Sequence, residues 1–150
     1  MRFFSTLLSL FALATSTVMA QGAGILSPPD MTQVPAGSTF DVSIGQPDSI
    51  SSWENIALVI GLANCAQFIS PSTCLGPDQE LGTIIYNGPF NPKFTTDPGT
   101  GGLPPHQNFT LTVPADFKKG QTQLGAALFV LVGALLFPTV ETFNTTIVVT

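Results

Sequence analysis

The chain has 150 residues, of which only 9% are charged, and its formal net charge at pH 7 is −5. Acidic residues outnumber basic ones by nine to four. This balance argues against nucleic acids and anionic membranes as partners, because both are held by Lys and Arg contacts to phosphate.

The first twenty residues have the pattern of a secretory signal peptide. A positive start at Arg2 precedes a mostly apolar run over residues 3–14, and small or modest side chains occupy positions 18 and 20, where signal peptidase reads. We predict cleavage between Ala20 and Gln21, since the run is too short to span a bilayer. We therefore expect an extracellular protein whose mature chain, residues 21–150, is a single domain with three basic and nine acidic residues and a net charge of −6.

The mature chain has the composition of an all-β protein. Its 14 Gly and 13 Pro residues separate short runs rich in Val, Ile, Thr and Phe, which is typical of a sandwich or a barrel. We predict an immunoglobulin-like β-sandwich of about seven strands. The expected strands cover residues 24–27 (continuing at 31–34), 38–45, 53–62, 82–87, 108–113, 122–132 and 142–149.

Alternation with a period of two predicts which side chains face the core. The expected inward residues are Phe40, Val42, Ile44, Ile56, Leu58, Ile60, Leu62, Phe109, Leu111, Val113, Phe143, Thr145, Ile147 and Val149. Two glycosylation sequons begin at Asn108 and Asn144, and each acceptor falls on the opposite, solvent-facing side of its strand. We predict N-glycosylation at both asparagines.

Cys65 and Cys74 are the only cysteines, nine positions apart. In an oxidising compartment such a pair most simply forms one local disulfide, and two free thiols are the alternative. A metal site is not expected at this pair, because no histidine or third cysteine stands near it.

Residues 124–137 contain no polar side chain. As a helix the run would reach about 21 Å, short of the roughly 30 Å of a bilayer core, so we expect no stable membrane insertion. We predict a central strand that is buried on both faces and bent at Gly133-Ala134. Long loops are expected at residues 63–81 and at residues 89–107, the second mobile or tethered, and such loops commonly carry recognition.

The sequence offers little for catalysis. His106 is the only histidine, and we expect it to be exposed in a Pro-rich loop, where a catalytic triad is not indicated. Two carboxylate pairs, Asp78 with Glu80 and Glu54 with Glu141, have the residue type that a glycosidase needs, but nothing else in the sequence pairs them. We therefore expect no enzyme, no catalytic residue, and no metal or cofactor site.

Trp53 and Tyr86 could form a platform on which a carbohydrate stacks. The alternative is that Trp53 opens a strand and packs in the sandwich or at its rim. A module that binds glycans or the cell wall therefore stays open as a second function.

Three segments, taken in order, form a recognisable set. They are residues 34–42, with a Pro-x-Gly-x-x-Phe pattern; residues 56–62, followed by 81–82 and 86–89; and residues 108–114, followed by 119–120, 131–134, Pro138 and 143–146. Over residues 25–149 the chain resembles the fungal necrosis-inducing secreted proteins, the Nis-type effector family. The resemblance implies a small non-enzymatic effector. Members are associated with plant cell death, suppression of pattern-triggered immunity and virulence through binding of receptor-associated kinases. No catalytic or contact position is carried over from the family.

Overall fold

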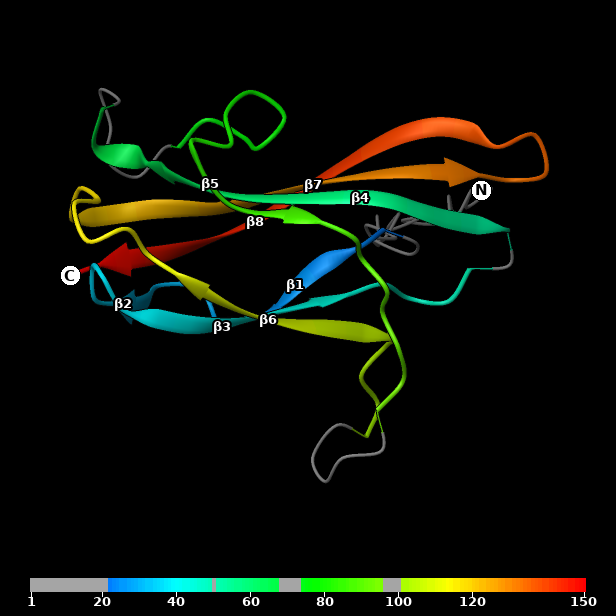
Figure 1. Ribbon diagram of the computed structural model, residues 1–150, viewed down its shortest axis with the longest axis horizontal. Helices are drawn as coiled ribbons and strands as arrows, with labels where there is room; N and C mark the ends of the chain where they lie inside the picture. The colour runs from blue at the N-terminus through cyan, green and yellow to red at the C-terminus, as the bar shows by residue number, and fades with distance from the viewer. Residues whose placement is uncertain (1–21, 50, 68–73, 96–100) are drawn as a thin grey trace, which may run out of the picture.

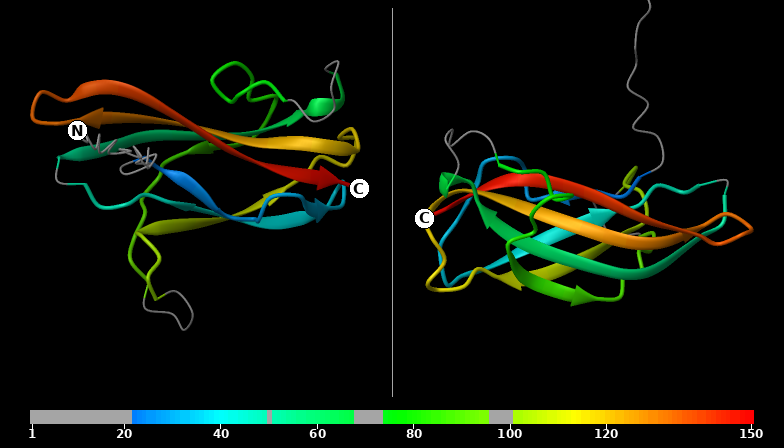
Figure 2. Two further views of the ribbon diagram at one scale, coloured as in Figure 1. Left: turned by 180° about the vertical axis from the view of Figure 1, so that it is seen from behind. Right: turned by 90° about the horizontal axis from the view of Figure 1, so that it is seen from above.

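A computed structural model describes residues 22–49, 51–67, 74–95 and 101–150. This part of the chain forms a three-stranded sheet with the order β1-β3-β6 and a five-stranded sheet with the order β2-β8-β7-β4-β5. The two sheets lie one over the other (Figures 1 and 2), so the predicted all-β sandwich is confirmed. The strands are β1 (Gly24–Ser27), β2 (Thr32–Val34), β3 (Thr39–Gly45), β4 (Trp53–Asn64), β5 (Thr83–Gly88), β6 (His106–Thr112), β7 (Gly120–Val132) and β8 (Phe137–Val149), and a short 3-10 helix, η1, covers Cys65–Gln67.

The strands lie close to the predicted ranges, but there are eight where about seven were expected. The first predicted strand is two strands, because β1 pairs with β3 in one sheet and β2 pairs with β8 in the other. Pro28 and Pro29 stand between them, and proline cannot donate a ladder hydrogen bond. The chain therefore changes sheets at this point. The β2–β8 pair is parallel, whereas the other strand pairs are antiparallel.

The apolar run over residues 124–137 is a hairpin, so the prediction of one bent strand is wrong. β7 ends at Val132 and β8 begins at Phe137. Between them Gly133 takes a φ of 75° and Leu136 a φ of 52°, and the Leu136 N–H donates to the Gly133 carbonyl at 3.1 Å. β7 is central, as expected, but the predicted burial on both faces fails at the turn, where Leu135 is 78% exposed.

The hydrophobic core fills the space between the sheets. Most of the residues that alternation predicted to face inward are buried. Three of them, Phe40, Phe143 and Thr145, are only half-buried. The fully or almost fully buried ones are Val42, Ile44, Leu58, Ile60, Leu62, Phe109, Leu111, Val113, Ile147 and Val149. Ile56 is 42% exposed, so its predicted inward position is wrong. The β4–β7 register shifts between Asn55 and Ala57, and such a bulge interrupts the alternation.

Each of the two predicted long loops is closed by an interaction near its ends, a disulfide in the first and backbone hydrogen bonds in the second. Cys65 and Cys74 form a disulfide with Cα atoms 4.7 Å apart, which confirms the predicted pairing. In the second loop, Lys93 and His106 exchange two backbone hydrogen bonds of 3.0 Å each. This loop is therefore tethered, one of the two expected outcomes.

The chain between the disulfide and β5 packs on the outer face of the five-stranded sheet. Leu81 passes so close to Gly61 that a Cβ at this glycine would overlap the Leu81 carbonyl oxygen. Gln123 on β7 is buried there, and its Nε2 donates to the Glu80 carbonyl at 3.2 Å. Glycine at position 61 is thus required by a close approach between two stretches of backbone.

Residues 1–21 lie outside the described part of the chain, so the signal peptide and its cleavage between Ala20 and Gln21 stay predictions. In the described ranges no helix has the length and apolar character of a membrane span.

Candidate binding site at one end of the sandwich

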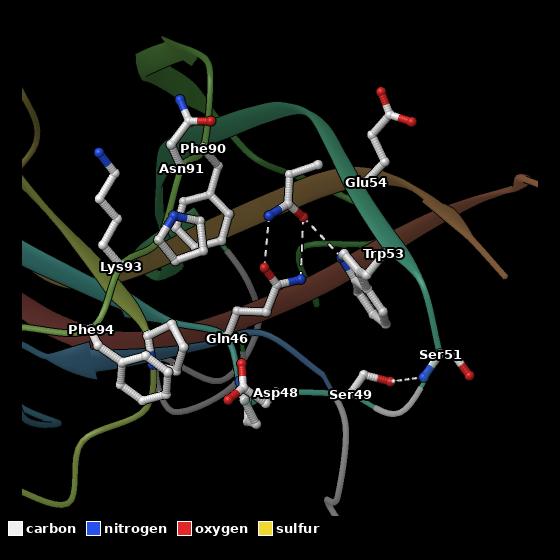
Figure 3. A pocket seen from close by; sticks show the side chains of 14 residues that line it. Gln46, Asp48, Ser49, Ser51, Trp53, Glu54, Phe90, Asn91, Lys93 and Phe94 are labelled. Carbon is white, nitrogen blue, oxygen red and sulfur yellow. Dashed lines mark hydrogen bonds between the residues drawn. The ribbon is translucent and has the colours of Figure 1, made fainter.

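A cavity of about 810 Å³ lies at one end of the sandwich (Figure 3). Its walls are the connection that follows β3 from Gln46, the first residues of β4, and the β5–β6 connection from Phe90 to Phe94. β3 and β4 belong to different sheets. The site is therefore built where the chain passes from one sheet to the other.

A hydrogen-bonded group of two amides and one indole forms the inner wall. Gln46 Nε2 donates to Asn55 Oδ1 at 3.2 Å, and Asn55 Nδ2 donates to Gln46 Oε1 at 2.7 Å. The Trp53 indole Nε1 donates to the same Asn55 oxygen at 2.9 Å (Figure 3). Because Asn55 accepts two hydrogen bonds, it fixes both the amide of Gln46 and the plane of the Trp53 ring.

The opposite wall is attached to the core. Phe90 is 1% exposed and stacks on Phe109, with ring centroids 6.5 Å apart. The Gln46 N–H donates to the Pro105 carbonyl at 2.8 Å, and the Asn91 N–H donates to Gln107 Oε1 at 2.7 Å. Both connections that line the cavity are therefore held by hydrogen bonds in the free protein.

The rim carries charge of both signs and an exposed aromatic ring. Asp48, Glu54 and Lys93 are among the lining residues, and the Glu54 and Lys93 side chains point outward from the cavity (Figure 3). Phe94 is 66% exposed and also borders a neighbouring hollow, of about 560 Å³, under residues 101–105. Such a surface suits a ligand with polar groups and an apolar part.

The two aromatic residues considered for a carbohydrate platform do not share a site. Trp53 is half-buried at the rim of the sandwich, as the alternative predicted, and lines the cavity. Tyr86 lies on β5, where its ring packs at 4.7 Å from that of Phe109 and its hydroxyl donates to the Pro89 carbonyl at 2.7 Å. The alternative, in which Trp53 packs at the rim, is therefore the one that the structure shows.

His106 is buried at the start of a strand, so the prediction that it is an exposed loop residue is wrong. It is the first residue of β6 and is 7% exposed. Its Nδ1 lies 2.9 Å from the Pro104 carbonyl oxygen, and since a carbonyl can only accept, Nδ1 carries the proton. The pairing of His106 with Lys93 extends β6 toward the loop, which explains the burial.

The two carboxylate pairs considered for a glycosidase lie away from this cavity or apart from each other. Asp78 and Glu80 belong to the loop over the five-stranded sheet, where the Glu80 N–H donates to the Gly76 carbonyl at 3.0 Å. Glu54 and Glu141 lie on β4 and β8, with β7 between them, and Glu141 accepts a hydrogen bond of 3.1 Å from the Ala23 N–H. Within the described ranges no three His, Cys, Asp or Glu side chains gather as a metal site.

The cavity residues Gln46, Asn55 and Phe94 were missed by the sequence analysis. Asn55 sits at the bulge of β4, which a period-two reading cannot detect. The exposure of Phe94 could have been predicted, because a large aromatic residue in a Pro-rich loop belongs to no strand that would bury it.

Both predicted glycosylation sites are exposed on strands. Asn108 lies on β6 opposite Ser43 of β3, and Asn144 lies on β8 opposite Gly125 of β7. Their exposure agrees with the predicted phase, and glycosylation itself stays a prediction.

The chain is similar to the superoxide reductase (neelaredoxin) from Ignicoccus hospitalis, with a TM-score of 0.41 and 14% identity over 85% of this chain and 80% of that one. It is also similar to the CooA pilin subunit from enterotoxigenic Escherichia coli, with a TM-score of 0.29 and 10% identity over 85% of this chain and 98% of that one. No curated protein matches the sequence. The sequence model of the Nis1 family matches residues 18–148, and the chain therefore belongs to the Nis1 family.

Proposed function

We propose that this protein is a non-enzymatic secreted effector that binds a host protein at the cavity end of its sandwich. Membership of the Nis1 family supports an effector-like protein in general. The host partner, by the resemblance described above, is a plant receptor-associated kinase, and the outcome of binding is cell death or suppression of immune signalling.

The observation that carries the proposal is that the fixed Trp53 ring and the exposed Phe94 ring line the same cavity, on opposite sides of it (Figure 3). Asn55 holds the indole by a 2.9 Å hydrogen bond, so little side-chain freedom is lost when a partner packs on it. Phe94 offers a second ring that is 66% exposed. Large aromatic anchors with a polar rim are the usual centres of protein–protein interfaces.

The proposal is tested by expressing the protein in leaves, with and without residues 1–20, and measuring cell death and the immune oxidative burst. We expect Phe94→Ala to abolish the effect without unfolding the protein, because the ring is mostly exposed. Leu75→Ala is the matched control, since Leu75 is also exposed but follows Cys74 and is not among the residues that line the cavity. An unchanged response with Phe94→Ala would remove the cavity from the mechanism.

Glycan binding is the second candidate, favoured by the amides of Gln46 and Asn55 beside an indole. Sugars are commonly held by amide hydrogen bonds and aromatic stacking. Retention of the protein on chitin or β-glucan, lost in Phe94→Ala, would favour this candidate. Capture of a purified receptor-associated kinase, with no retention on either polysaccharide, would favour the effector.

A further inference from the structure

The turn that joins β7 to β8 is apolar and exposed. Leu135, Leu136 and Phe137 are 78%, 50% and 62% exposed, and Val140, three residues further on, is 62% exposed. In Figure 1 this hairpin forms one end of the molecule, opposite the C-terminus. Contiguous exposed apolar surface of this kind marks an interaction site.

The apolar surface covers both faces of the hairpin as well as its tip. On the inner face, Phe137 is exposed and pairs with Val132, which pairs on its other side with Trp53; Val132 and Trp53 are half-buried against the core. On the outer face, Leu131 pairs with Pro138 and Phe129 with Val140. A flat protein surface would cover only one of these faces, whereas a fluid medium that the tip enters covers both.

The charge pattern indicates which medium this is. No Asp, Glu, Lys or Arg occurs between Lys119 and Glu141. The lysines at positions 118 and 119 precede the start of β7, at the other end of that strand from the tip. Across the strand pair, Glu54 on β4 lies opposite Leu131. Anionic lipid requires basic residues beside the inserted segment, so a tip that has no basic residue and lies beside a carboxylate suits neutral head groups.

The backbone of the turn is partly satisfied within the protein. The Gly133 N–H donates to the Ser52 carbonyl at 2.8 Å, and the Leu136 N–H donates to the Gly133 carbonyl at 3.1 Å. These bonds lower the free-energy cost of moving the turn from water into the bilayer, because backbone N–H and C=O groups without a partner are costly in hydrocarbon.

We propose that the β7–β8 hairpin tip is a lipid-contact site that inserts reversibly into the surface of a bilayer with neutral head groups. Strand residues advance about 3.3 Å each, so the stretch from Phe137 to Val140 spans about 10 Å, comparable with the depth reached by interfacial segments. The tip adjoins the cavity, because Trp53 lines the cavity and pairs with Val132, but the proposed lipid contact does not depend on the function proposed for the cavity.

The test is co-sedimentation of the protein with phosphatidylcholine vesicles, read together with tryptophan fluorescence. Trp53 is the only tryptophan and lies in the same cross-strand row as Phe137. We expect vesicle binding and a blue shift of its emission. Phe137→Ser should weaken binding on the order of tenfold, which is the effect of removing one large apolar side chain from the buried surface.

Two further variants keep the result interpretable. Leu136→Asn should also weaken binding while keeping the turn, because φ at this position is 52° and asparagine tolerates that conformation. Ile84→Ser is the matched control, since Ile84 is 49% exposed on β5 and pairs with Gly61, away from the tip. It should bind vesicles like the unaltered protein.

Several outcomes would overturn the proposal. They are no sedimentation with phosphatidylcholine, binding that appears only when phosphatidylserine is added, or binding that persists in both tip variants. Dimerisation in solution that Leu136→Asn abolishes, without vesicle binding, would assign the tip to a second copy of the chain instead.

Discussion

The side-chain amides of Gln46 and Asn55 hydrogen-bond to each other in both directions and thereby link the two sheets at the cavity end of the sandwich. Gln46 follows β3 and is 8% exposed, while Asn55 belongs to β4. A reciprocal amide pair fixes both the distance and the relative orientation of the two segments, the end of β3 and the start of β4. It also leaves the second acceptor site of Asn55 for the indole of Trp53.

Asn55→Ala should destabilise the protein, because it leaves both the buried Gln46 amide and the Trp53 indole without their partner. A buried polar group left unpaired costs about 1–3 kcal/mol. Urea denaturation of Asn55→Ala is expected to show a loss of this size in the free energy of unfolding. Asn87→Ala, at an exposed position of β5, is the control and should be close to neutral. Equal stability of the two variants would show that the amide pair does not support the fold.

Gly61→Ala should be strongly destabilising. A methyl group at this position would overlap the backbone oxygen of Leu81, and a backbone atom cannot move aside as a flexible side chain can. Overpacking of this kind costs about 1–3 kcal/mol or more. Gly24→Ala, where a Cβ meets open space, should leave the melting temperature almost unchanged. Similar melting temperatures for the two variants would contradict the close approach.

Cys65→Ser should lower the melting temperature of the oxidised protein. Closing a loop across nine positions restricts the unfolded chain by about 2–3 kcal/mol in the chain-entropy model. Calorimetry of both forms in the presence and absence of a reductant is the measurement. The unaltered protein should lose stability on reduction and the variant should not. A reductant effect of the same size in both would mean that the disulfide contributes nothing.

Asn108→Gln and Asn144→Gln should each remove one glycan from protein secreted by a fungal host. Both asparagines are exposed on strands, where an attached sugar points into solvent. Gel mobility before and after enzymatic deglycosylation is the measurement, and each single variant is expected to run between the unaltered protein and the double variant. Identical mobility for all four forms would show that neither sequon is used.

The sandwich could be predicted because most strands obey a simple rule. In β6, for example, Phe109 and Leu111 are buried while Asn108 and Thr110 are exposed, so the sequence itself records which face meets solvent. The rule failed where the chain departs from regular pairing. A bulge moved Ile56 to the surface, and a turn made entirely of apolar residues hid the end of β7.

The cavity could not be predicted from the sequence, because its parts are brought together by the packing of the sheets. Gln46 and Asn55 stand nine positions apart and carry no motif. Their hydrogen bonds depend on the place where β3 ends and on the bulge in β4. The burial of His106 has the same origin, since it follows from the pairing with Lys93 across the long loop.

The parallel pairing of β2 with β8 also constrains the order in which the molecule can assemble. Among the described strands, β2 is made second but β8 is its sole neighbour in the sheet, and β8 is made last. The pairing closes a loop of more than a hundred residues, from Thr32 to Ile147, and contacts of such long range form late. The larger sheet therefore cannot be complete before β8 has been made, and until then β2 lacks its partner strand and β7 has an open edge.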